Sequence, residues 1–412
     1  MYDKKEIIMK YIFFIFLVLF SAGCVSKSSS SSNSLDEDKI PVIDLKKVIS
    51  GKEHEFLLSD IAKGIEYIPL EFSPECPIQL NVAPWDMYVT SNDIFILSHI
   101  IYRFDKNGKF LNKIGTIGRG PGEFITALGI AVDTIAKLLY LHSLENQIHI
   151  YDYNGKHVRT IRSSNINEPG FYFIGQTSEL FYRGAGDAHH KPGNYFIRIT
   201  DTLGNIRFEK KTLISGMLRE GERTWWDLRS MPDGEAVFAL DCMSDTIFRY
   251  QQSTLTPYMI LDYGRYKVTF KALMSTNYQL ETGRYFRTSL HGSTPKYFFF
   301  GVSQSGNSNY NNQKSYNIRY DKITGECISK KTTAEFFIND LDGGMPITKV
   351  GRYNKKNQWI FPIDAFEMKE ELSSAHFSTA KAKDPEAKQR LMELVGKLKD
   401  EDNPVLMRVI LK

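Results

Sequence analysis

Cysteine is scarce in this chain, whose four cysteines stand far apart at Cys24, Cys76, Cys242 and Cys327. No two of them have the Cys-x-x-Cys spacing of zinc ribbons or redox-active dithiols. This scarcity argues against a disulfide framework and against a cysteine-based zinc site. If Cys24 is used elsewhere, as argued below, three thiols remain. Either two of them form a single disulfide, or all three are buried as free thiols.

The sequence also lacks a strong charge of either sign and lacks long apolar runs. Its formal net charge is +4, which leaves no footprint of nucleic-acid binding. The apolar run Tyr11–Phe20 is too short to span a bilayer as a helix, which takes about 20 residues. The chain carries no P-loop, Rossmann fingerprint, zincin helix or nucleophile elbow. The sequence therefore points to no cofactor and to no catalytic constellation.

The N-terminus has the layout of a secretory signal. Three lysines lie within the first ten residues, ahead of the apolar run, and small residues follow that run. Ser21–Cys24 resembles the lipobox of bacterial lipoproteins, in which the chain is cut before a cysteine that carries the lipid. Ser21 departs from the usual leucine. The alternative is an ordinary secretory cleavage site with a chance cysteine.

We therefore expect a signal peptide over residues 1–23 and a folded domain over residues 40–412. Between them, residues 24–39 would form a lipidated cysteine and a tether, because serine runs bury no apolar area and stay flexible. The expected location is the outer membrane, with the domain in the periplasm or at the cell surface.

A repeated hairpin unit organises the folded part. The segment Ile101–Lys109 recurs as Ile148–Lys156 and Phe196–Gly204, with a longer copy at Tyr316–Gly325 and a degenerate one at Ile247–Leu255. Each full copy is an alternating strand, an Asp-x-x-Gly turn and another strand. Asp caps such a turn and Gly supplies its positive φ. The first three turn glycines are 47 and 49 positions apart, which is the size of a four-stranded propeller blade.

The period predicts an all-β fold, a six-bladed β-propeller. Its first five blades are expected at about residues 83–115, 127–162, 171–211, 227–262 and 285–331. The sixth blade would combine residues 346–351, Gln358–Ile363 and Pro404–Leu411 with an outer strand from Ile65–Phe72. Joining both chain ends in one blade closes the ring and leaves no open sheet edge. A β-sandwich or two smaller β-domains would not explain the period.

Three segments carry a family resemblance. The segments Ile65–Glu71, Gly118–Phe124 (GRGPGEF) and Asn403–Leu406 resemble the NHL-like six-bladed β-propeller lipoproteins of Gram-negative anaerobic gut bacteria. The resemblance covers nearly the whole mature chain, and it implies the fold and an envelope location. It implies little about activity, because NHL-type propellers include protein- and ligand-binding modules as well as a few lyases and lactonases.

The blade assignment predicts which face carries function. In a four-stranded blade, the turns between the second and third strands and the connections between blades open on one face. Every long excursion falls in such a position, while the repeated turns are tight. These excursions are 183–194, 215–226, 264–285, 303–314 and 364–403. Loops gathered on one face of a rigid scaffold are the usual layout of a binding site.

The Gly118–Phe124 segment lies on the same face, between the first two blades. Its glycines allow tight backbone geometry that could present N–H groups to an anion, with Arg119 and Glu123 as ligand contacts. The alternative is a structural inter-blade turn in which Glu123 caps backbone donors.

Aromatic residues provide a second candidate contact. Trp225 and Trp226 stand beside Arg223, and sugar rings or protein partners commonly stack on such side chains. The alternative is that one tryptophan begins a strand and packs between blades. Tyr310, in an Asn/Ser-rich loop, is a weaker candidate of the same kind.

Metal binding is a weaker hypothesis. Asp187, His189 and His190 lie close together in one loop. Adjacent histidines rarely converge on one ion by themselves, so a site would need a ligand from elsewhere, such as His99, His142 or His291. We predict no metal centre from the spacing of these residues.

The last excursion, 364–403, contains a predicted helix. Asp384 can serve as its N-cap with Pro385 at the first helical position. An apolar stripe at helical spacing follows, formed by Leu391, Leu394, Val395 and Leu398. The stripe is expected to pack on the propeller, and docking to a partner is the alternative.

Three hypotheses for function follow. The first is a non-catalytic binding lipoprotein that holds a glycan, peptide or protein on the loop-bearing face of the propeller. The second is a propeller enzyme, a lyase or hydrolase with a metal-assisted site at the channel mouth, which needs His and acidic residues converging from several blades. The third is a structural component of an envelope complex. Propeller enzymes assemble sites from isolated residues, so the missing motifs weigh little between them.

Overall fold

The structure of the protein is a computed structural model. It describes residues 39–78, 87–144, 147–162, 171–174, 178–183, 195–214, 229–233, 236–241, 243–275, 283–305, 313–354 and 357–412. All of these belong to one compact unit, Asp38–Lys412. No helix among the described residues is both long and apolar enough to cross a bilayer.

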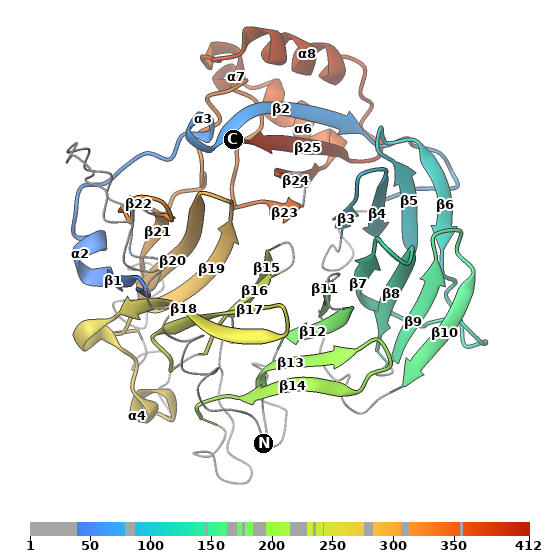
Figure 1. The fold of residues 1–412 in the computed structure, drawn as a ribbon. Coiled ribbons are helices and arrows are strands. Elements are labelled where there is room, and N and C mark those ends of the chain that lie inside the picture. Colours follow the sequence, from blue (N-terminus) through green and yellow to red (C-terminus); the bar gives the residue numbers. More distant parts are fainter. Residues whose placement is uncertain are drawn as a thin grey trace, which may run out of the picture. The chain divides into compact units, whose positions relative to one another are not determined.

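Six small sheets form a six-bladed β-propeller, which confirms the predicted fold (Figure 1). Blades 1 to 3 comprise β3 (Met87–Val89), β4 (Asp93–Leu97), β5 (Ile101–Asp105), β6 (Phe110–Ile114), β7 (Ala127–Asp133), β8 (Leu138–Ser143), β9 (Gln147–Asp152), β10 (His157–Arg162), β11 (Phe171–Ile174), β12 (Glu179–Arg183), β13 (Tyr195–Asp201) and β14 (Ile206–Lys211). Blades 4 and 5 comprise β15 (Arg229–Asp233), β16 (Ala236–Leu240), β17 (Thr246–Gln251), β18 (Thr254–Asp262), β19 (Arg287–Ser293), β20 (Tyr297–Ser305), β21 (Gln313–Asp321) and β22 (Cys327–Lys331).

Blade 6 joins the two ends of the folded unit. Its order is β2 (Ala62–Pro69), β25 (Val405–Leu411), β24 (Gln358–Ile363) and β23 (Arg352–Asn354). Val409 on β25 lies opposite Ile65 on one side and Trp359 on the other. The ring is therefore closed by a strand from each end of the sequence, as predicted.

Two strands of blade 6 differ from the prediction. The inner strand is β23, not residues 346–351. Ile347 instead forms an isolated antiparallel bridge with Phe337, and its carbonyl accepts hydrogen bonds from the amides of Phe336 (2.7 Å) and Phe337 (3.1 Å). The outer strand begins at Ala62 and ends at Pro69, about three residues earlier than expected. Beyond it, the amide of Leu70 reaches back to the carbonyl of Pro404.

The repeated turns have the chemistry that the sequence predicts. Asp152 Oδ1 accepts from the amides of Asn154 and Lys156, both at 2.9 Å, and Gly155 has a φ of +89°. Asp105 and Asp201 make the same pair of bonds, two and four residues ahead. Each side chain thus satisfies two backbone donors that the turn leaves unpaired.

The segment before β2 covers the outer edges of two blades, which the sequence did not indicate. β1 (Val42–Asp44) adds a fifth, parallel strand to β18 in blade 4. It is followed by α2 (Leu45–Ile49), which packs on β22, and by α3 (Leu58–Ile61). Short helices η1 (Gly264–Tyr266) and α4 (Phe270–Leu273) follow blade 4.

A helical insertion covers the outer edge of blade 6. It consists of α6 (Ala365–Leu372), α7 (Ala375–Thr379) and α8 (Pro385–Val395), and α8 lies outside β2 (Figure 1). Asp384 caps α8 by accepting from Ala387 N at 2.9 Å, as predicted. Leu391 is buried, and the rest of the stripe packs on the same cluster. The stripe thus packs on the propeller, as expected.

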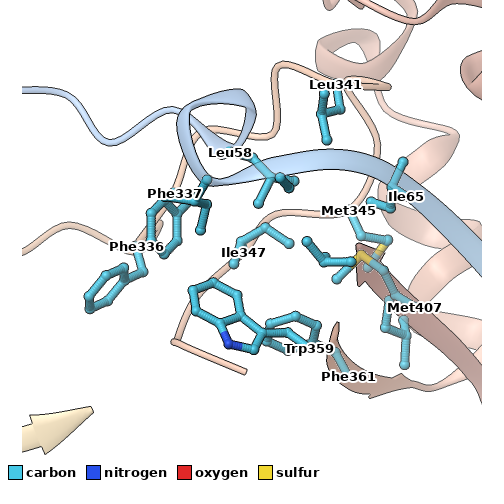
Figure 2. Close-up of a cluster of buried hydrophobic side chains, with 14 of the residues drawn as sticks. Leu58, Ile65, Phe336, Phe337, Leu341, Met345, Ile347, Trp359, Phe361 and Met407 are labelled. Atoms are coloured by element: carbon cyan, nitrogen blue, oxygen red, sulfur yellow. The ribbon is translucent and has the colours of Figure 1, made fainter. Parts of the chain in front are cut away.

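The largest of the buried clusters joins blades 5 and 6 to this insertion. Figure 2 shows Phe336 and Phe337 converging with Trp359, Ile347 and Met407. Phe337 and Trp359 have ring centroids 5.6 Å apart, within the range of favourable aromatic contacts.

Candidate functional site

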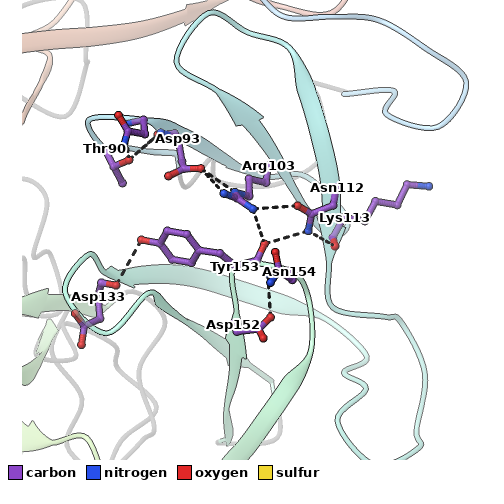
Figure 3. Close-up of polar contacts among 10 residues, drawn as sticks. Thr90, Asp93, Arg103, Asn112, Lys113, Asp133, Asp152, Tyr153 and Asn154 are labelled. Atoms are coloured by element: carbon purple, nitrogen blue, oxygen red, sulfur yellow. Dashed lines mark hydrogen bonds and ion pairs between the residues drawn. The ribbon is translucent and has the colours of Figure 1, made fainter.

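The candidate site lies where blade 1 passes into blade 2. The Gly118–Phe124 loop connects β6 to β7 and therefore opens on the same face as the other inter-blade connections. At the opposite end of this blade interface, Arg103 of β5 binds Asp93 at 2.8 Å and the carbonyl of Tyr153 at 3.1 Å (Figure 3). This polar network links blade 1 to blade 2 at the end of their interface that lies opposite the loop.

Glu123 shapes the loop from within. Its Oε2 accepts from Gly120 N at 2.7 Å, and its own amide donates to the Gly120 carbonyl at 3.0 Å. A methyl group at Gly118 would lie 2.0 Å from the Glu123 carboxylate, and one at Gly120 would lie 3.0 Å from it. The glycines are therefore needed to let the carboxylate fold back under the loop. Glu123 has the capping role that the structural interpretation assigns to it.

Side chains of blade 2 contact the loop at Gly122. The Tyr151 hydroxyl donates to the Gly122 carbonyl at 2.8 Å, and the His157 ring packs against Gly122, which has a φ of +78°. Burial, with a smaller contribution from the Glu123 charge, raises the pKa of Tyr151 to about 12. Phe124 is buried among the side chains of blades 1 and 2. The loop is thus held in place by hydrogen bonds and by the packing of Phe124.

A pocket of about 400 Å³ opens between this loop and the outer strands of blade 2. Besides the loop residues and Ile125, its lining consists of Gln147, His149, Thr160 and Arg162. These four residues form two cross-strand pairs, because Arg162 lies opposite Gln147 and Thr160 lies opposite His149. We call this cavity the inter-blade pocket.

A bulge in β10 aims its side chains into the pocket. The register shifts between His157 and Arg159, so that His157, Thr160 and Arg162 share one face of the strand. The Thr160 hydroxyl lies 2.9 Å from His157 Nε2 and 3.1 Å from His149 Nδ1. A hydroxyl has one proton and two lone pairs, so Thr160 donates to at most one of the two rings and accepts from at least one.

The pocket has two cationic side chains. Arg119 on the loop and Arg162 at the end of β10 are both exposed. In the described part of the chain, neither guanidinium has a carboxylate within ion-pair distance. Glu123, the acidic residue of the lining, is occupied by the loop backbone. The described lining therefore has two cationic side chains and one acidic side chain.

The sequence indicated part of this site. Arg119 and Glu123 were found through the glycine-rich segment, whereas Gln147, His149, Thr160 and Arg162 were missed. Gln147 and His149 lie on β9, while Thr160 and Arg162 lie on the edge strand β10, and the four converge only through the register of these two strands. The available signal was the polar residues of two paired strands, His149 on β9 and His157 and Arg162 on β10.

Most of the other predicted site residues lie outside the described residues. These are Cys24, Asp187, His189, His190, Arg223, Trp225, Trp226 and Tyr310, together with Cys242. They stay predictions. Among the described residues, no three His, Cys, Asp or Glu side chains are grouped as metal ligands. Cys76 and Cys327 are both free thiols, so no disulfide joins them.

The histidines considered as additional metal ligands have separate positions. His142 is buried on β8, and burial lowers its pKa to about 4. His291 on β19 lies 3.3 Å from the Ser289 hydroxyl, and its ring packs edge-on against Phe336. Gly301 opposite leaves room for both side chains, since a methyl group there would lie 2.4 Å from His291. His291 thus packs against the segment that follows blade 5.

Comparison with known proteins places the chain in a family. Residues 40–409 match the family described as "Domain of unknown function (DUF4934)", and the chain belongs to it. Among curated proteins, none matches the sequence. A "Putative exported protein" from Bacteroides fragilis has a similar structure, with a TM-score of 0.61 and 17% identity over 87% of this chain and 98% of that one. A DUF4221 family member from Bacteroides vulgatus gives a TM-score of 0.45 and 11% identity over 88% and 99%. The first likeness shows the fold alone.

Proposed function

We propose that this chain is a non-catalytic binding protein of the cell envelope whose inter-blade pocket holds a small polar ligand. The observation that carries the proposal is the pocket itself. Its volume of about 400 Å³ falls in the range of small-molecule sites, roughly 300–1,000 Å³. It is built from a fixed loop and two strands, and it presents two arginines without carboxylate partners in the described part. A preformed site of this kind binds without first ordering its own walls.

The envelope location rests on the N-terminus. A basic stretch, a ten-residue apolar run and Ser21–Cys24 support a signal peptide followed by lipid attachment at Cys24. The structurally similar protein described as exported is consistent with this route. We propose that the serine-rich tether holds the propeller at the outer membrane. Metabolic labelling with a radioactive fatty acid should mark the wild-type chain and leave Cys24→Ser unlabelled.

A ligand screen with a blocked pocket tests the binding role. Residues 25–412 retain every strand of the propeller and would be applied to glycan and peptide arrays. In parallel, Gln147→Trp would fill the pocket, and Gln389→Trp on the exposed face of α8 would serve as the matched control. We expect a ligand that binds the wild type and the control but not Gln147→Trp. A ligand that binds all three equally would place the functional site elsewhere.

A further inference from the structure

We infer that the inter-blade pocket recognises an acidic sugar, with its carboxylate or sulfate held between Arg119 and Arg162. This inference rests on the proposed function and specifies its ligand. The two guanidinium groups come from different walls of the pocket, Arg119 from the loop and Arg162 from β10. A planar guanidinium donates two parallel hydrogen bonds to a carboxylate or sulfate, which makes arginine the preferred cation for such groups.

The charges of the site favour an anion over a neutral ligand. Glu123 is the acidic residue among the described lining, and its Oε2 is already bound to Gly120 N at 2.7 Å. The lining therefore has two positive side chains and one negative one, and the negative one is bound to the loop backbone. An anion in the pocket would be attracted by both arginines, whereas a neutral ligand would gain nothing from their charge.

The rest of the pocket fits the body of a sugar. At about 400 Å³, it is much larger than a single carboxylate or sulfate group. Gln147, His149 and Thr160 add an amide, an imidazole and a hydroxyl beside the arginines, and these groups can exchange hydrogen bonds with sugar hydroxyls. Ile125, which is 47% exposed, offers an apolar contact at the edge of the same lining.

The test uses calorimetric titration of residues 25–412 at low ionic strength. The probes are D-galacturonate, D-glucuronate, N-acetylneuraminate and galactose 6-sulfate, with galactose as the neutral counterpart. We expect at least one acid to bind, with galactose weaker by about tenfold or more. Comparing the carboxylates with the sulfate identifies which oxyanion the site prefers. The affinity should also fall as salt is added.

Variants locate the charge contact. Arg119→Ala and Arg162→Ala should each weaken binding of the acid by about tenfold or more, whereas Arg162→Lys should lose less because it keeps the charge. Arg390→Ala, an exposed arginine on α8, is the control and should bind as the wild type does. Both pocket arginines are exposed, so their loss should leave the fold intact.

The outcomes separate this inference from the proposed function. If galactose binds as tightly as the acids, or if both arginine variants bind normally, the inference is overturned. It is also overturned if none of the four acids binds. In each case the proposed function survives provided that an array ligand is lost in Gln147→Trp. If that variant blocks nothing, the pocket is not the functional site and both proposals fail.

Discussion

At the scale of single residues, glycines with positive φ decide where the chain turns and how closely the blades meet. Gly155 is the clearest case, because its φ is +89° and a methyl group there would lie 2.8 Å from the carbonyl oxygen of Lys113 in the preceding blade. The sequence predicted the turn from the Asp-x-x-Gly pattern. It did not predict the inter-blade contact, since that depends on how neighbouring blades are placed.

We therefore expect Gly155→Ala to destabilise the propeller by roughly 1–3 kcal/mol, through left-handed backbone strain and the clash with the neighbouring blade. Thermal unfolding of the two proteins would measure this. Gly396→Ala is the control, because Gly396 ends α8 at a φ of −61° and the nearest atom to an added methyl is 3.5 Å away. Equal losses in the two variants would contradict the explanation.

Buried His142 makes stability depend on pH. Burial lowers its pKa from 6.5 to about 4, so the folded chain keeps it neutral while the unfolded chain protonates it below about pH 6.5. The unfolded state then binds more protons, and stability falls as the pH drops from 6.5 towards 4, by about 3 kcal/mol in all. Denaturant unfolding of His142→Gln between pH 7.5 and 4.5 should show a shallower decline than the wild type. Parallel declines would mean that His142 does not contribute.

At the scale of elements, strand register and helix packing determine which side chains are available. The register of β10 puts Thr160 and Arg162 into the inter-blade pocket. The bulge in β10 recurs at the matching place in β6 and β14, so it belongs to the repeated hairpin, but the repeat does not show which side chains reach a pocket. The α8 stripe was predictable, since its spacing and its Asp384 cap are local. β23 was placed too early, because the tertiary bridge at Ile347 competes with strand formation. Local sequence patterns therefore predict where a helix or strand lies better than they predict which segments it packs against.

Packing of α8 on blade 6 can be tested with two adjacent residues. Leu391 is 1% exposed and Met392 is 50% exposed. We expect Leu391→Ala to cost about 2–4 kcal/mol through lost burial and a cavity, and Met392→Ala to change stability by less than about 0.5 kcal/mol. Chemical denaturation would compare them. A neutral Leu391→Ala would mean that α8 is not packed on the propeller in solution.

At the scale of the whole molecule, closure of the ring depends on strands from both ends of the folded unit. β25 pairs with β2 on one side and β24 on the other, so both neighbours become open edges without it. β1 is different, because it adds to the outside of a complete four-stranded blade. The closure was predictable from the hairpin period. The covering role of residues 42–61 was not, because that segment belongs to no repeat.

Truncations at the two ends should therefore have unequal effects. Removing residues 405–412 should give an aggregating chain without a cooperative unfolding transition, since it opens the ring. A chain that begins at residue 45 should still fold cooperatively, with a lower melting temperature from the loss of β1. Size-exclusion chromatography and calorimetry would distinguish the two proteins. A soluble, cooperative chain without β25 would contradict closure by blade 6.

A crystal structure of residues 25–412 grown with the acidic sugar that binds most tightly tests sugar binding in the inter-blade pocket most directly. We expect electron density in the inter-blade pocket, with an oxyanion within hydrogen-bond distance of Arg119 and Arg162 and the sugar ring beside Thr160 and Gln147. Density for the sugar on another part of the propeller, with this pocket empty, would contradict it.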